Sequence, residues 1–160
     1  EYEKDSQCRR NGTVAALRVL LRLCAKTGTQ IGMPHVILEY SRNVIEELDF
    51  HPVFVRIHEA LAATGAFAIE EIKSRAVCHD WHAVGSGRPQ SAFVHVQLSI
   101  LEGRSPEIRK AAGAAIMSII RETFHQSWDE LELSLSVEVR EMSRETYFKD
   151  RSDGPTHIEL

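Results

Sequence analysis

A methionine followed directly by a proline, at Met33-Pro34, is the feature of this sequence best suited to chemistry. If Met33 is the start of translation, an aminopeptidase removes it, because the next residue is small, and Pro34 becomes the N-terminus. Its nitrogen is then a free secondary amine with a pKa near neutrality, held in a fixed direction by the ring. Such an amine can act as a general base. The alternative is that Pro34 only begins a strand.

The chain as printed carries residues 1–33 ahead of this proline. While they remain attached, the nitrogen of Pro34 belongs to a tertiary amide and cannot accept a proton. We therefore expect the 160-residue chain to be inactive in any reaction that uses Pro34 as its base.

One arginine is a candidate for binding an anion. Arg104 lies beside Ser105-Pro106, a strong helix start, where free amide donors and the helix dipole favour negative charge. A guanidinium can bind a carboxylate through two parallel hydrogen bonds, although a surface arginine is more often simply solvated. Lys73 and Arg75 alternate along an expected strand and therefore share one of its faces.

Histidines offer a weaker signal. In Cys78-His79-Asp80-Trp81-His82, the two histidines would point to opposite faces of a strand and no fourth ligand is evident, so we expect no metal. His95 fits a hydrogen-bonded core histidine. His35 and Glu39, close to Pro34, could tune that site or only line it. No phosphate loop or nucleophile elbow is present, and we expect no cofactor.

The surrounding sequence predicts four strands and two helices, in the order β-α-β followed by β-α-β. Apolar runs and one strict alternation of apolar and polar residues indicate strands at residues 36–40, 67–78, 92–100 and 131–139. A helix from Pro52 to Thr64-Gly65 would bury Val53, Phe54, Ile57 and Leu61. A second helix would run from Ser105 to about Trp128. Two such units form an α+β sandwich.

Length and composition limit the class of protein. With 160 residues, 43% of them hydrophobic, the chain can bury one core, so we expect one domain with an extension. The net charge of -4 argues against a general nucleic-acid binder. No apolar run approaches the roughly 20 residues that a membrane helix needs. Three scattered cysteines form no disulfide framework, which fits a reducing cytoplasm.

The first 32 residues form a basic extension that we do not expect to be part of the fold. They hold six Lys or Arg against three acids, while residues 33–160 carry a net charge of -7. Leu17, Leu20, Leu21 and Cys24 fall on one face of a possible helix. A targeting helix, a partner-docking helix, and an artefact of an upstream start or a fusion are the three interpretations. The acids at the start count against targeting, and we favour the artefact.

Five motifs carry a family resemblance: Met33-Pro34-His35-Val36-Ile37-Leu38-Glu39-Tyr40, Leu61-Ala62-Ala63-Thr64-Gly65, Ile72-Lys73-Ser74-Arg75, Ala92-Phe93-Val94-His95-Val96 and Gly103-Arg104-Ser105. In this order they resemble the 5-carboxymethyl-2-hydroxymuconate isomerase family of the tautomerase superfamily, from Met33 to about Lys149. The resemblance implies the tautomerase fold, with two helices on one face of a four-stranded sheet, and a homotrimer.

The resemblance also implies the site. Pro34 would be the general base and Arg104 the catalytic arginine, while Lys73 and Arg75 would bind substrate carboxylate. Relatives usually have Ile-Arg-Ser-Arg where this chain has Ile72-Lys73-Ser74-Arg75. Lysine keeps the charge but lacks the planar guanidinium that binds a carboxylate through two hydrogen bonds, so the identity of the substrate is in question.

The implied activity is a cofactor-free isomerisation. The substrate would be the dienol 5-carboxymethyl-2-hydroxymuconate, from the breakdown of hydroxyphenylacetate-type aromatics, and the product its 2-oxo-3-ene isomer. Two alternatives stay open. One is a tautomerase of another enol, such as phenylpyruvate, which needs a single carboxylate contact. The other is a non-catalytic homologue with a blocked Pro34, acting as a binding or scaffold protein.

Overall fold

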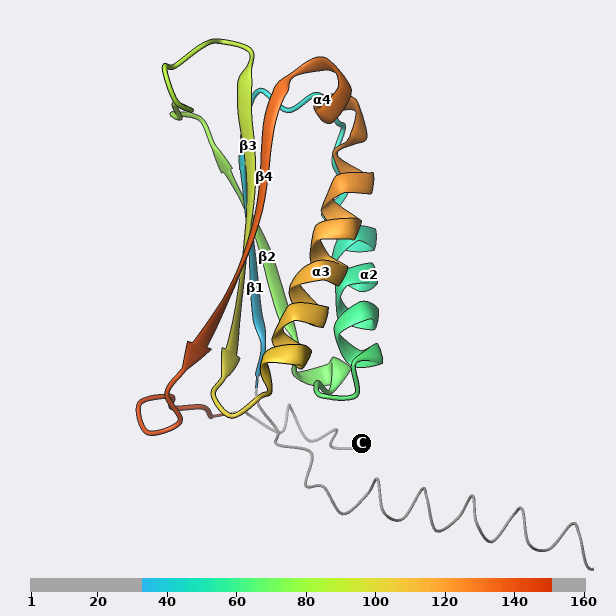
Figure 1. The fold of residues 1–160 in the computed structure, drawn as a ribbon, viewed down its shortest axis with the longest axis vertical. Coiled ribbons are helices and arrows are strands. Elements are labelled where there is room, and N and C mark those ends of the chain that lie inside the picture. The colour runs from blue at the N-terminus through green and yellow to red at the C-terminus, as the bar shows by residue number, and fades with distance from the viewer. Residues whose placement is uncertain (1–32, 151–160) are drawn as a thin grey trace, which may run out of the picture. The chain divides into compact units, whose positions relative to one another are not determined.

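The computed structural model describes residues 33–150, which fold as one sheet with helices against it (Figure 1). In chain order the elements are β1 (His35–Ser41), α2 (Phe50–Ala63), the short 3₁₀ helix η1 (Ile69–Glu71), β2 (Lys73–His79), β3 (Ser91–Leu101), α3 (Pro106–Thr123), α4 (His125–Glu130) and β4 (Glu132–Met142). All of them belong to one compact unit, Gly32–Leu160. The expected extension lies outside the described residues.

The four strands lie in the order β2-β1-β3-β4. β1 pairs with β2 in parallel and β3 with β4 in parallel, while the central pair, β1 and β3, is antiparallel. Each parallel pair is joined by a helical crossover, α2 in the first unit and α3 with α4 in the second. Both long helices lie on the same side of the sheet (Figure 1). The predicted α+β architecture of two β-α-β units is therefore confirmed.

Local sequence signals begin and end the two long helices. Asp49 caps α2 by accepting a hydrogen bond from the amide of His51, so the helix begins before the expected Pro52. It ends where Gly65 takes a φ of 73°, a conformation that glycine adopts without strain. The Ser105 hydroxyl caps α3 and Pro106 occupies its first position, as predicted.

Two expected boundaries were wrong. The second strand begins at Lys73 and not at residue 67, because Ile69–Glu71 forms a 3₁₀ turn and Phe67 packs into the core. The long second helix ends at Thr123 and does not continue to Trp128. Phe124, fully buried, leaves the helical conformation there with ψ of 36°, and the separate helix α4 follows. Tertiary packing overrides the local helical pattern at this point.

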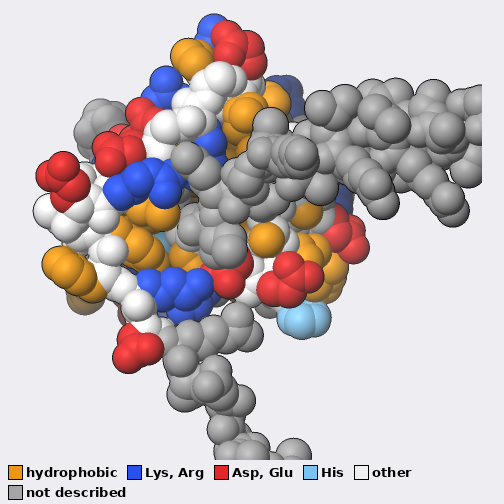
Figure 2. Space-filling model, turned by 90° about the horizontal axis from the view of Figure 1, so that it is seen from below, with side chains coloured by type: hydrophobic (Ala, Val, Ile, Leu, Met, Phe, Trp, Pro, Cys, Tyr) orange, Lys and Arg blue, Asp and Glu red, His pale blue; other side chains and the backbone are white. Residues whose placement is uncertain are grey.

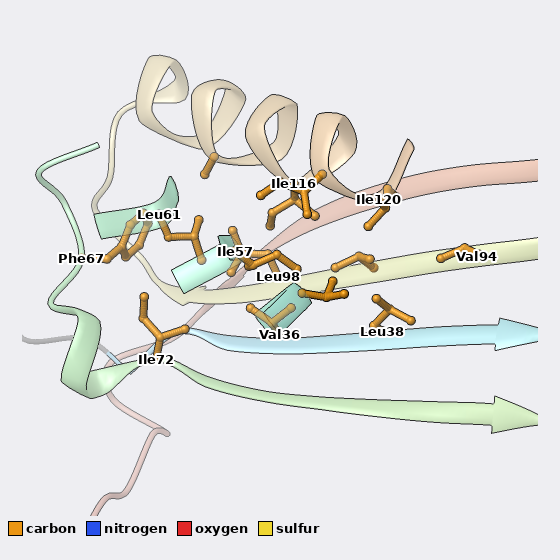
Figure 3. Packing of buried hydrophobic residues seen from close by; sticks show 14 of the residues in the cluster. Val36, Leu38, Ile57, Leu61, Phe67, Ile72, Val94, Leu98, Ile116 and Ile120 are labelled. Atoms are coloured by element: carbon orange, nitrogen blue, oxygen red, sulfur yellow. The ribbon is translucent and has the colours of Figure 1, made fainter. Parts of the chain in front are cut away.

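The hydrophobic core fills the space between the sheet and the helices (Figure 3). Alternate residues of the central strands point into it, since side chains along a strand alternate between faces. Fully buried members include Val36, Leu38, Val94, Val96, Leu98, Ile57, Leu61, Ile116 and Ile120. This core fixes which face of each strand is turned away from the helices.

That opposite face, called the outer face below, carries polar side chains. Glu39 of β1 accepts a hydrogen bond from His79 of β2 at 3.2 Å, and His95 of β3 lies 2.8 Å from the hydroxyl of Ser136 in β4. His95 is therefore hydrogen-bonded, as expected, but on the outer face and not in the core. Across residues 33–150, the structure holds no helix with the length and apolarity to span a membrane.

Candidate active site

The residues that the sequence singled out come together at one end of the sheet, the lower end in Figure 1. Pro34 directly precedes β1, and its carbonyl accepts a hydrogen bond from the amide of Lys73 at 3.0 Å, at the start of β2. In the antiparallel pair, His35 lies opposite Ser99, so the C-terminal end of β3 is also there. Arg104 follows β3 after a short turn.

Pro34 is fully buried at the head of β1. The carbonyl bond to Lys73 fixes its backbone against the neighbouring strand. An amine in such a position favours its neutral, proton-accepting form, because burial penalises charge.

Arg104 is buried, with 8% of its surface exposed, and is not the solvated surface arginine of the alternative interpretation. Its guanidinium donates to the carbonyl of Leu101 at 2.8 Å and to that of Ala66 at 3.4 Å, and lies 4.9 Å from the centre of the Phe67 ring. Burial, and then the charge of Arg144, lower the pKa of Arg104. The side chain thus joins the end of β3 to the turn after α2.

Lys73 and Arg75 lie on the outer face, as the alternation of β2 predicts, and both are exposed. Ser74 between them points the other way, with its hydroxyl 2.7 Å from His58 of α2. Arg104 reaches toward the turn after α2, on the helix side of the sheet. One chain therefore brings these cations to the same end of the sheet but not to the same face.

Seen from that end, the described surface shows cationic side chains on either side of a band of hydrophobic ones (Figure 2). A groove of about 560 Å³ lies elsewhere, between α3 and β4, lined by Lys110, Met117 and Val139 among others. It contains none of Pro34, Lys73 and Arg104, so its size does not make it the site.

His35 and Tyr147 lie at the same end of the sheet as Pro34, Lys73 and Arg104. The Nε2 of His35 lies 3.0 Å from the hydroxyl of Tyr147, and the two rings meet edge to face. Burial, followed by the charges of Arg75 and Lys73, lowers the pKa of His35, so this ring stays neutral at physiological pH. From the sequence, His35 could tune the site or only line it, and no motif marked Tyr147. The two residues are 112 positions apart, and no local pattern joins them.

The histidines near β2 do not form a metal site. His79 bonds Glu39, and His82 packs edge-on against Phe93. Among residues 33–150, no three His, Cys, Asp or Glu side chains converge on a point where a metal could bind.

The fold and this arrangement define a tautomerase-type α+β protein. The crystal structure of a 5-carboxymethyl-2-hydroxymuconate isomerase from Deinococcus radiodurans R1 matches 76% of this chain and 91% of its own, with a TM-score of 0.69 and 30% identity. A fused 4-OT symmetric trimer, 10% identical, matches 69% of this chain and 86% of its own with a TM-score of 0.56, which shows a common fold alone.

Sequence comparison defines the family. The sequence model of 5-carboxymethyl-2-hydroxymuconate isomerase matches residues 34–152. A 5-carboxymethyl-2-hydroxymuconate Delta-isomerase of Escherichia coli is 36% identical over 120 residues, which are 75% of this chain and 95% of the relative. The chain belongs to the 5-carboxymethyl-2-hydroxymuconate isomerase family and is an enzyme of the isomerase class, as its motifs indicated.

Proposed function

We propose that this protein isomerises 5-carboxymethyl-2-hydroxymuconate to its 2-oxo-3-ene isomer, with Pro34 as the general base. The observation that carries the proposal is the position of Pro34. It is the first residue matched by the family, and it is buried at the head of β1, at the end of the sheet where Lys73 and Arg104 also lie. The reaction belongs to the degradation of aromatic compounds.

The proposed reaction consists of two proton transfers, one from the substrate to Pro34 and one from Pro34 to the substrate. The free amine of Pro34 takes the proton of the 2-hydroxyl group, electrons move along the dienol, and the protonated amine returns a proton to C5. The 2-hydroxyl becomes the 2-oxo group and a 3-ene remains, so atoms and charge balance without a cofactor. Burial keeps the amine neutral before the first step.

The cations would bind and stabilise the anionic substrate. Arg104, already held by two carbonyls, would present its guanidinium to a carboxylate and to charge developing at the 2-oxo end. Lys73 and Arg75 would bind a second carboxylate. Because they lie on the other face of the sheet from Arg104, we propose that they serve the site of a neighbouring subunit in a homotrimer.

Lys73 favours a second candidate substrate. Where relatives usually have an arginine, a lysine offers one point charge in place of a planar fork. Replacing the arginine by a lysine would cost an enol with a single carboxylate, such as phenylpyruvate, less binding free energy than it would cost a tricarboxylate. The same proline would serve as its base.

The test compares two chains, one beginning at Met33-Pro34 and one of full length. We expect the shorter chain, with Met33 removed as shown by its mass, to ketonise 2-hydroxymuconate-type dienols, and the full chain to show only the background rate. The buried core cluster that the structure describes runs from Val36 to Phe124, and the family model matches residues 34–152, so the shorter chain keeps both. Equal rates, with the full chain intact by mass, would exclude Pro34 as the base. Inactivity of both would favour a binding or scaffold role.

A further inference from the structure

The segment after β4, residues 143–150, crosses the same end of the sheet as the proposed site, and we call it the strap. It follows the last residue of β4, whose carbonyl accepts a hydrogen bond from the amide of Glu102 at 3.0 Å. The strap lies at the lower end in Figure 1, beside the start of β1. Nothing in the sequence patterns of this polar segment indicated a role.

The strap is attached at three points. The backbone amide of Arg144 donates to the Glu102 carboxylate at 3.0 Å, and its guanidinium donates to the Glu102 carbonyl at 3.0 Å. The Tyr147 hydroxyl lies 3.0 Å from His35 Nε2. Lys149 forms an ion pair with Glu71, whose side chain is 15% exposed.

Each point of attachment is next to one residue of the proposed site. His35 directly follows Pro34, Glu71 comes two residues before Lys73, and Glu102 comes two residues before Arg104. These three residues come from segments far apart in the chain, and the strap contacts all three segments. It therefore joins the three segments that carry Pro34, Lys73 and Arg104.

We propose that Tyr147 is a positioning residue of the isomerase site, which donates a hydrogen bond from its hydroxyl to His35 and so fixes the head of β1, with Pro34, relative to the turn that carries Arg104. This inference rests on the proposed function for its effect on the reaction, but the contact itself can be tested without any activity.

Two physical effects follow from this contact. The Tyr147 proton occupies the Nε2 lone pair, so His35 carries its own proton on Nδ1 and resists becoming a cation. An uncharged ring beside Pro34 adds no positive charge next to the proposed base, at an end of the sheet where Lys73 and Arg75 already lie. The bond also restrains the residue that follows Pro34, and small errors in the position of a catalytic group reduce the rate strongly.

The first test measures His35 by nitrogen-15 NMR in the full chain, with Tyr147→Phe against the parent. The ring signals are assigned from a His35→Asn variant. We expect the parent ring to be the Nδ1-H tautomer, and Tyr147→Phe to raise the pKa of His35 by about half a unit or more. A parent ring in the Nε2-H tautomer would overturn the proposal, because His35 would then donate to Tyr147 and would not accept its hydrogen bond.

The second test measures kinetics in chains that start at Pro34. Tyr147→Phe should lower kcat about threefold to tenfold, the size expected from one lost hydrogen bond, with KM changed less than kcat. Phe148→Ala is the matched control, because Phe148 is the next residue of the strap and is 90% exposed. Equal effects of the two substitutions, or an unchanged kcat in Tyr147→Phe, would overturn the positioning role.

The two tests separate this inference from the function it rests on. If the parent chain starting at Pro34 is inactive, the proposed function fails while the NMR test still decides whether Tyr147 holds His35. If the parent is active and Tyr147→Phe matches it in both measurements, the function stands and the inference fails.

Discussion

At the scale of single residues, Arg104 stabilises the fold in addition to its proposed role in catalysis. Its guanidinium holds two backbone carbonyls, from Leu101 and Ala66, and packs over Phe67. A catalytic group restrained in this way is pre-organised, because it loses little freedom when substrate binds. The same restraint means that a substitution at Arg104 affects stability and catalysis together, so the two effects have to be measured separately.

Arg104→Ala should lower kcat about a hundredfold and raise KM, because an interaction with developing charge is strongest in the transition state. It should also reduce the free energy of unfolding by about 1 to 3 kcal/mol, since buried carbonyls lose their donor. Steady-state kinetics and urea unfolding measure the two effects. Arg56→Ala, which removes an exposed arginine paired with Glu122, is the control and should leave kcat unchanged. An effect on KM alone would limit Arg104 to binding.

Lys73 decides between the candidate substrates. Lys73→Ala should reduce kcat/KM for the tricarboxylate far more than for phenylpyruvate, and Lys73→Arg should bind the tricarboxylate at least as well as the parent. The planar guanidinium of the arginine could strengthen substrate binding by up to about 1 to 2 kcal/mol. The measurement is kcat/KM for both substrates in chains starting at Pro34. Lys110→Ala, which changes another exposed lysine, is the control. Equal losses for the two substrates would show that Lys73 is not the carboxylate site.

At the scale of elements, the crossover helix α2 is held to the edge strand β2 by a polar contact as well as by the core. His58 of α2 bonds Ser74 at 2.7 Å, on the helix side of the strand whose other side carries Lys73 and Arg75. This contact helps to fix which way β2 faces. A strand turned over would exchange its cations for a serine on the outer face, because the side-chain period is two.

His58 should make stability depend on pH. Burial lowers its pKa below the ordinary value of 6.5, so the unfolded chain binds a proton more readily than the folded one. Its contribution to stability is therefore present above about pH 6.5 and is lost as the pH falls through the folded pKa. Urea unfolding at about pH 7.5 and about pH 5 should show a larger difference for the parent than for His58→Gln. An identical difference in the two proteins would contradict this assignment.

At the scale of the whole described domain, two β-α-β units share one sheet and one core, and both helices cover the same face. The outer face keeps a row of polar and ionisable side chains, among them Glu39, His79, His95 and Glu138. Lys73 and Arg75 project from this face, while Arg104 reaches to the helix side. A site that uses all three cations is therefore easier to build from two copies than from one.

We expect the chain that starts at Pro34 to be a homotrimer. Sedimentation equilibrium should give three times the mass of one chain, with the assembly persisting as the protein is diluted. If neighbouring subunits share sites, a mixture of Pro34→Ala and Lys73→Ala chains should turn over the tricarboxylate faster than either variant alone. A monomer with full activity would contradict this arrangement.

Local sequence patterns predicted the order of the elements and the face of β2 on which its cations lie. Periodicity and capping residues identified the order of strands and helices, and the alternation of β2 placed Lys73 and Arg75 on one face, because these are local properties of the backbone. Only the tertiary structure decided that residues 67–72 leave the strand and that Arg104 is buried against Ala66. It alone joined Tyr147 to His35. These contacts connect residues 38 and 112 positions apart, and distances of that kind are set by packing and by no local pattern.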